Sequence, residues 1–137
     1  MAITAAITLT SAAGDLVTDA LSLSTSCNLS KAGVTTALEN TAGLARKTTT
    51  SASQYTLFAA ADYTDDKANK IYLKNTETNA ALYFLISIHD VEVGRIYAGD
   101  WVMLPWSADT TGDNADFKIT PSSSASHTLE YMLFYEQ

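Results

Sequence analysis

Residues 91–106 read VEVGRIYAGDWVMLPW and predict two consecutive β-strands that break at residues 98–100. Glycine permits backbone angles that other residues resist, and proline cannot donate within a central ladder, so the second strand is expected to end at Pro105. Both tryptophans of the chain lie in this segment. Because tryptophan brings a large apolar area, we expect Trp101 to lie in the core and Trp106, beyond the proline, to lie nearer the rim.

The sequence on both sides of this segment predicts further short strands. Residues 2–10 and 21–29 alternate apolar with Ser, Thr or Asn side chains, and residues 127–135 show a similar period of two. Residues 82–88 form a continuous apolar run, which is typical of a strand covered on both faces or of a strand at a subunit contact. About nine short strands with frequent turn signals and no amphipathic helix predict an all-β, jelly-roll-like antiparallel β-sandwich.

Length and composition predict one domain that associates with other chains. The 137 residues are expected to form a single sandwich, with residues 1–15 as an N-terminal arm or edge strand. Hydrophobic residues make up 47% and charged residues 17% of the chain, against about 25% charged in ordinary domains. We therefore expect a homo-oligomer, in particular a trimer. An ordinary Thr/Ala-rich β domain remains the alternative.

Charge, hydropathy and cysteine content exclude several classes of protein. The net charge of −7 argues against binding to nucleic acid, which needs clustered Lys and Arg. The apolar run at residues 80–88 is too short to cross a membrane. A signal peptide would begin with basic residues, but the first Lys or Arg of this sequence is Lys31. The single Cys27 cannot form an internal disulfide, which suits folding in a reducing cytoplasm, and its place in the alternation predicts a buried thiol.

The charge is unevenly distributed along the chain. Residues 1–61 carry three acids and three bases, whereas residues 62–137 carry twelve acids and five bases and hold the whole net charge. A neutral surface is easier to desolvate, so we expect the first half to contact a partner and the second half to face solvent, unless the split is accidental. The residues that we expect at interfaces are Ile3, Ile7, Leu9, Leu82, Phe84, Ile86 and Trp106.

The sequence contains no recognisable catalytic or cofactor motif. His89 and His127, the only histidines, fall at a turn and at a strand start, and no serine occupies a nucleophile elbow. We therefore expect no enzyme activity, no cofactor and no zinc site, for which ligands are too few and too scattered. Two acidic loops, residues 62–66 and 109–116, leave calcium as an alternative, although neither has EF-hand spacing.

Carbohydrate binding is a further alternative. Aromatic side chains can stack on sugars, although tyrosines that alternate along strands more often belong to a core or an interface. The candidates for a stacking platform are Tyr63, Tyr72, Tyr83, Tyr97, Trp106 and Tyr131.

Several segments together resemble small virion structural proteins of tailed bacteriophages, including phages of cyanobacteria and marine hosts. The similar segments are NKIYLKNTET, GRIYAGDWVMLPWSA and DFKITPSSSASHTLEYMLFYE within residues 69–136, with weaker similarity in the first half. In those proteins an aromatic-flanked strand before Pro-Trp precedes a D-[IF]-K-[IV] strand and a terminal L-E-Y-M-L segment.

The resemblance implies a non-enzymatic protein that is made in the host cytoplasm and located in the virion. The resemblance leaves open whether the protein decorates the capsid or belongs to the tail. We expect a capsid decoration or cement protein that self-associates and binds the major capsid protein or another virion protein. The alternative is a tail or fibre component with a receptor-binding or carbohydrate-binding face.

Overall fold

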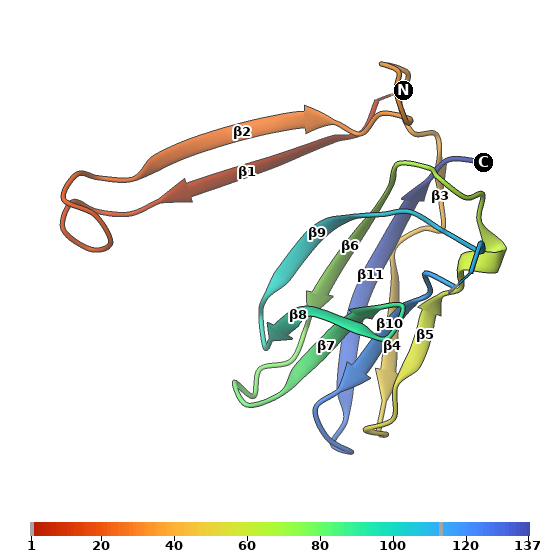
Figure 1. Cartoon of the computed structure of the whole chain (residues 1–137). Coiled ribbons are helices and arrows are strands. Elements are labelled where there is room, and N and C mark those ends of the chain that lie inside the picture. Colours follow the sequence, from red (N-terminus) through yellow and green to blue (C-terminus); the bar gives the residue numbers. More distant parts are fainter. Residues whose placement is uncertain (1, 113) are drawn as a thin grey trace. The chain divides into compact units, whose positions relative to one another are not determined.

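The computed structural model describes residues 2–112 and 114–137, and the regular structure of these residues consists of antiparallel β-strands and one short 3₁₀ helix (Figure 1). Contacts divide the chain into a first unit that ends at Leu38 and a second unit, Glu39–Gln137. This differs from the single domain over residues 1–137 that we expected. The separate segment runs well beyond residue 15, because it contains two strands rather than one. In the part of the chain that the structure describes, no helix is long and apolar enough to span a bilayer.

The first unit is a long β-hairpin with a small irregular base. Strands β1 (Thr4–Thr10) and β2 (Ser22–Asn28) pair in antiparallel register without a bulge, from Thr4 opposite Asn28 to Thr10 opposite Ser22. At the base, the Leu29 N–H donates to the Ile3 carbonyl at 2.8 Å, and the Leu38 N–H donates to the Leu29 carbonyl at 2.8 Å. Leu29 and Leu38 are buried, while most side chains of β1 and β2 are exposed.

The second unit is a jelly roll. Its strands are β3 (Asn40–Thr41), β4 (Ala45–Thr49), β5 (Tyr55–Phe58), β6 (Asn69–Asn75), β7 (Tyr83–Ile88), β8 (Val91–Tyr97), β9 (Trp101–Trp106), β10 (Phe117–Pro121) and β11 (His127–Tyr135). A short 3₁₀ helix, η1 (Ala60–Asp62), follows β5. One sheet has the order β4-β11-β6-β9, with β3 also paired to β11, and the other has the order β5-β10-β7-β8. The fold class expected from the sequence is therefore confirmed.

The pairing within the jelly roll is nested. Strand β7 pairs with β8, β6 with β9, β5 with β10 and β4 with β11. The segment from β4 to β11 is therefore one long hairpin, and its strand pairs are divided between the two sheets. The hairpin folds back at His89 and Asp90, whose φ angles of 50° and 57° are those of a type I′ turn. This is the arrangement that defines a jelly roll of eight strands.

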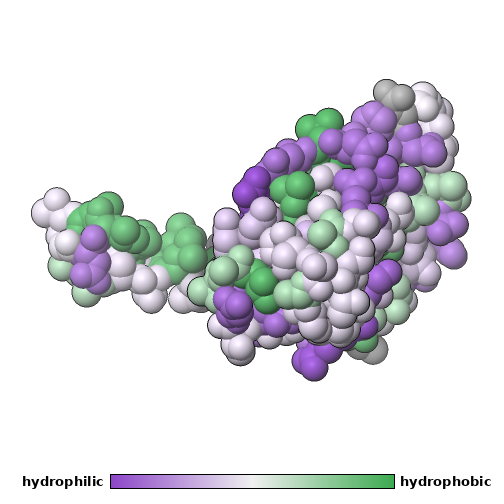
Figure 2. Space-filling model, turned by 90° about the horizontal axis from the view of Figure 1, so that it is seen from below, coloured by the Kyte–Doolittle hydropathy of each residue, from purple (hydrophilic) through white to green (hydrophobic). Residues whose placement is uncertain are grey.

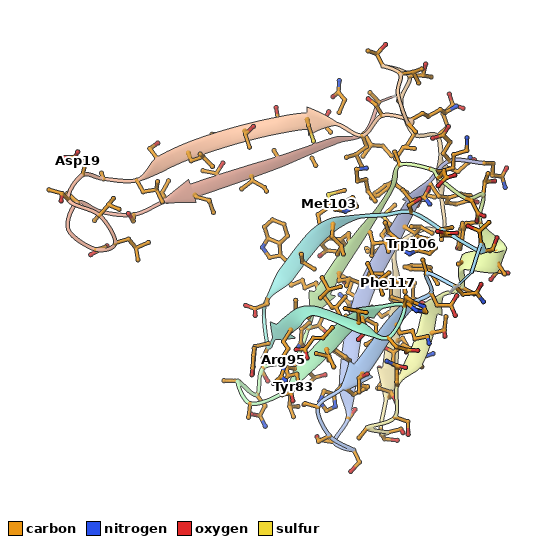
Figure 3. The ribbon with its side chains drawn as sticks, viewed as in Figure 1. Asp19, Tyr83, Arg95, Met103, Trp106 and Phe117 are labelled. Atoms are coloured by element: carbon orange, nitrogen blue, oxygen red, sulfur yellow. The ribbon has the colours of Figure 1, made fainter. Side chains whose placement is uncertain are left out.

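The core lies between the two sheets, where inward residues alternate with outward ones along each strand. Ile71 and Leu73 of β6 face inward, as do Phe117 and Ile119 of β10 and Leu129 of β11. Phe117 and Trp106, both labelled in Figure 3, are almost completely buried. Regular alternation over antiparallel strands thus provides the hydrophobic interior of this unit.

Strand β7 is a central strand of its sheet and not an exposed contact strand. It lies between β10 and β8, and its Phe84 and Ile86 side chains are almost completely buried in the core of their own chain. Both were expected at an interface, and the structure corrects this. A continuous apolar run fits a strand covered on both faces, and here the opposite sheet provides the cover for the inward residues.

The burial of the two tryptophans is the reverse of what we expected. Trp106 is 3% exposed, its ring lies 6.1 Å from that of Phe58, and its Nε1–H donates to the Ala115 carbonyl at 2.8 Å. Trp101 is 54% exposed. Strand β9 continues through Pro105 because it is an edge strand, where a missing N–H can be tolerated. Alternation then places Trp106 inward and Trp101, five residues earlier, outward.

This assignment predicts unequal effects of two substitutions. Trp106→Ala should lower the free energy of unfolding by about 3–5 kcal/mol, because it removes a large core aromatic and leaves its space empty. Trp101→Ala should change it by less than about 1 kcal/mol, as is usual for exposed positions. Urea unfolding of both variants, followed by far-ultraviolet circular dichroism, measures the difference. A larger loss for Trp101→Ala would contradict the burial described above.

Candidate functional site

The β1–β2 hairpin has one apolar and one polar face. Because paired residues share a face, the register assigns Ala5, Ile7 and Leu9 of β1 to the same side as three residues of β2, Leu23, Thr25 and Cys27. The opposite side consists of Thr4, Ala6, Thr8 and Thr10 with Ser22, Ser24, Ser26 and Asn28. We call the first of these the apolar face of the hairpin. The alternation seen in the sequence therefore corresponds to a real separation of the two faces.

The apolar face is exposed. Ile7 is 40%, Leu9 51% and Leu23 46% exposed, and Figure 2 shows hydrophobic residues in green along the hairpin. A shallow hollow of about 90 Å³ lies on this face, lined by residues that include Ala5, Ile7 and Cys27. Apolar residues gathered on one exposed face, rather than scattered singly, make this face a candidate binding surface.

Charge is absent from both strands of the hairpin. The ionisable groups between residues 2 and 30, apart from Cys27, are Asp15 and Asp19, and both lie in the connection between β1 and β2. This connection also exposes Leu16 and Val17, and it turns at Gly14, which has a φ of 86°. On the polar face, the Thr4 hydroxyl donates to the Asn28 side-chain oxygen at 2.9 Å. The two strands of the hairpin therefore present an uncharged surface, and the two carboxylates are confined to the connection between them.

Cys27 is exposed, which corrects the buried thiol expected from the sequence. The sequence pattern assigns Cys27 to the same face as Leu23 and Leu29, and the register confirms this face for Leu23. The burial was wrong because an apolar face is buried only where another layer covers it. In the first unit, β1 and β2 form a sheet of two strands.

The interface candidates from the sequence fall into two groups. Ile7 and Leu9 lie on the apolar face of the hairpin, and Ile3 lies half-buried at its base. Leu82 is half-buried before β7, where its carbonyl accepts a hydrogen bond from the Asn75 side chain at 3.1 Å. Trp106, like the β7 candidates, belongs to the core. Sequence analysis missed Leu23, although the period of two in residues 21–29 contained the necessary signal.

A second surface lies on the outer side of the sheet that contains β7 and β8. The rings of Tyr83 and Tyr97 have centroids 5.0 Å apart, and the Arg95 guanidinium lies 4.9 Å from the centroid of the Tyr83 ring (Figure 3). The Arg95 side chain also forms an ion pair with Glu92 at 3.3 Å. Of the tyrosines expected to stack on sugars, Tyr83 and Tyr97 are therefore brought together on one surface.

The other candidates for a stacking platform do not join this surface. The rings of Trp106, Tyr63 and Tyr135 form a contiguous aromatic cluster, with Tyr63 5.4 Å from Trp106 and 5.2 Å from Tyr135. A hollow of about 380 Å³ beside this cluster is lined by Tyr63, Tyr135, Asp62 and Glu136, among others. Burial raises the pKa of Tyr63. The Tyr131 ring lies edge-on against Phe58, and Tyr72 donates to Glu130 at 3.1 Å.

A Ser–His pair closes the turn between β10 and β11. Ser122 Oγ lies 3.0 Å from His127 Nε2, and His127 Nδ1 lies 2.6 Å from the Ala125 carbonyl. His127 is completely buried, with its ring against Phe84, and Ser122 Oγ also accepts a hydrogen bond from the Tyr83 N–H. Each polar atom of the pair thus has a partner within the fold, which fits a structural role rather than an activated nucleophile.

The carboxylates of the acidic loops accept hydrogen bonds from N–H and hydroxyl groups of the protein and so stabilise the loop conformations. Asp109 accepts hydrogen bonds from the backbone N–H and the hydroxyl of Thr111, which lowers the pKa of Asp109. Asp65 accepts from the Thr110 hydroxyl at 2.8 Å, and Asp116 accepts from the Ala60 N–H at 2.8 Å. Asp113 lies outside the described residues. Among the described residues, no group of three His, Cys, Asp or Glu side chains is placed to hold a metal ion.

No protein-family model and no curated protein matches this chain. Among solved structures, the crystal structure of the Yersinia pseudotuberculosis-derived mitogen is similar over 72% of this chain and 87% of the mitogen, with 11% sequence identity and a TM-score of 0.45. A similarity this distant does not bear on function.

The exposure of the hairpin predicts a reactive thiol in the native protein. The rate at which Cys27 reacts with Ellman's reagent in buffer should be within about threefold of its rate in urea, because the thiol is exposed on the face of a two-stranded sheet. Cys27 is the only cysteine, so the absorbance reports this site alone. A thiol that reacts only after unfolding would show that the apolar face is covered in the isolated protein.

Proposed function

We propose that this protein is a virion structural protein that decorates a phage capsid, self-associates, and attaches through the apolar face of its β1–β2 hairpin. The observation that carries the proposal is this uncovered face, which lies outside the jelly roll on a separate compact unit. A two-stranded hairpin is only marginally stable in water unless a further layer packs on it. Binding therefore supplies the packing that the hairpin lacks.

The distribution of charge supports the same division of roles. The strands of the hairpin carry no charged side chain, so little free energy is lost in desolvating them. Interface cores are depleted of charge in the same way. Residues 62–137, all in the second unit, hold twelve acids and five bases and provide the solvated part of a shell protein. A jelly roll is also an architecture that viral capsid proteins use, although a fold does not by itself define a function.

The mechanism is mechanical and requires no chemistry. Each bound copy would add contact area between neighbouring shell proteins and so oppose the separation of capsomers under internal pressure. A specific, stable interface of this kind buries on the order of 1,200–2,000 Å² in total. The number of copies that associate, expected from the sequence to be three, is a prediction for sedimentation analysis.

The matched pair Ile7→Asp and Thr8→Asp tests attachment. The two residues are neighbours on β1 and both are exposed, but Ile7 lies on the apolar face and Thr8 on the polar face. After co-expression with the major capsid protein of the same genome, electron microscopy of the shells should show at least a tenfold loss of occupancy for Ile7→Asp, because a buried carboxylate must be desolvated. Thr8→Asp should keep occupancy within about twofold. Equal occupancy for the two variants would refute attachment through this face.

The second candidate function is a tail or fibre component that binds a carbohydrate receptor. The pair Tyr83 and Tyr97 with Arg95 favours it, because the rings are adjacent and Tyr97 is exposed. Tyr97→Ala should abolish glycan-array binding if this surface is the receptor site, while Thr56→Ala, on β5 of the same sheet, should not. Absence of binding by the unaltered protein would remove this candidate.

A further inference from the structure

The edges of the jelly roll and the edges of the hairpin are built differently. Strand β8 carries Glu92 and Arg95 and pairs with β7 through an irregular register, strand β9 contains Pro105, and strand β5 has only four residues. Charges, bulges, prolines and short strands are the devices by which proteins prevent an edge from pairing with another chain. Strands β1 and β2 are seven residues long and have no charge, proline, glycine or bulge. The hairpin edges are therefore open to strand addition.

The backbone groups on the outer edge of β1 belong to its even-numbered residues. The Ser11 N–H donates to the Leu21 carbonyl at 3.0 Å, and the Ile3 carbonyl accepts from the Leu29 N–H. Ser11 and Ile3 flank β1, so its odd-numbered residues direct their N–H and C=O groups toward β2, and alternation turns those of Thr4, Ala6, Thr8 and Thr10 away from it. In the described structure these outward groups face no other strand.

We propose that β1 pairs antiparallel with β1 of a second copy of this chain, around a two-fold axis at Ile7. In this register Ile7 lies opposite the partner's Ile7 and Ala5 lies opposite the partner's Leu9. On the polar face, Thr4 lies opposite the partner's Thr10, and Ala6 opposite the partner's Thr8. Small residues meet large ones, β-branched residues meet each other, and no like charges are opposed, which are the pairings that stabilise a sheet.

The position of the axis follows from the outward groups. Thr4, Ala6, Thr8 and Thr10 are placed symmetrically about Ile7, so this register uses all four residues of each copy in hydrogen-bonded pairs. A shift of the axis by one residue leaves at least one of them unpaired in each copy. Strand β1 is favoured over β2 because Ile, Leu and Thr have higher β-propensity than the Ser and Asn residues that dominate β2.

The result is a four-stranded sheet in the order β2-β1-β1-β2. A two-fold axis perpendicular to a sheet keeps each face on its own side, so the apolar faces of the two hairpins become continuous. This pairing uses the edge of the hairpin and leaves its apolar face free, so it goes beyond the proposed attachment and can fail independently of it. The same contact can join two single chains, or it can join one chain from each of two larger oligomers.

Disulfide trapping tests the register. In a Cys27→Ser background, Ile7→Cys should give a covalent dimer with oxidised glutathione as electron acceptor, because Cα atoms opposite each other in a non-hydrogen-bonded pair lie about 4.5 Å apart, within disulfide range. Leu9→Cys is the matched control on the same face of the same strand. Its two copies would lie about 13 Å apart, four residues along the ladder, and should cross-link at least tenfold more slowly.

A proline substitution provides the second readout. Ala6→Pro removes an N–H that points away from β2, so the hairpin should keep its ladder while the edge loses a donor. In the Ile7→Cys background it should reduce the yield of covalent dimer at least tenfold. Equal cross-linking of the Ile7→Cys and Leu9→Cys proteins, no cross-linking of either, or a dimer that Ala6→Pro leaves unchanged would each overturn the proposal.

Discussion

The jelly roll depends on the turn at His89 and Asp90. Both residues have positive φ, so the chain reverses within two residues and Ile88 comes to lie opposite Val91. The pairs β6–β9, β5–β10 and β4–β11 are nested outside the β7–β8 pair. A change of register at this turn would therefore shift the register of those three pairs as well. The turn is also fixed from outside. Lys118 forms an ion pair with Asp90 at 2.9 Å, which lowers the pKa of Asp90, and the His89 N–H donates to the Asp116 carbonyl at 3.2 Å.

Local alternation allowed the fold class to be predicted from the sequence. Residues 91–106 form two strands joined at a glycine turn, as their pattern indicates, and the segments around residues 2–10, 21–29 and 127–135 are strands as well. The tryptophans were assigned wrongly because the prediction relied on proline as a strand terminator. In the structure, the parity of positions along β9 decides burial, and an edge strand tolerates Pro105.

The candidate site could be predicted only in part. Alternation identified Ile7 and Leu9 as members of an apolar face, but it contains no information about whether another layer covers that face. For Phe84 and Ile86 the cover is the opposite sheet, whereas for Cys27 the first unit supplies none. Similarly, the sequence could not show that Tyr83 and Tyr97 lie opposite each other, because neighbours across a ladder depend on long-range pairing.

The lack of charged groups on the strands of the hairpin has a consequence for the conditions under which it associates. Contacts between ionised side chains weaken as salt screens them, but burial of aliphatic and hydroxyl side chains has no such dependence. Sulfate and phosphate salts strengthen burial of this kind, and cooling weakens it, because the driving force comes from the release of hydrating water. The affinity of an association through these strands would therefore change little with ionic strength or pH. The affinity would be lowest at low temperature.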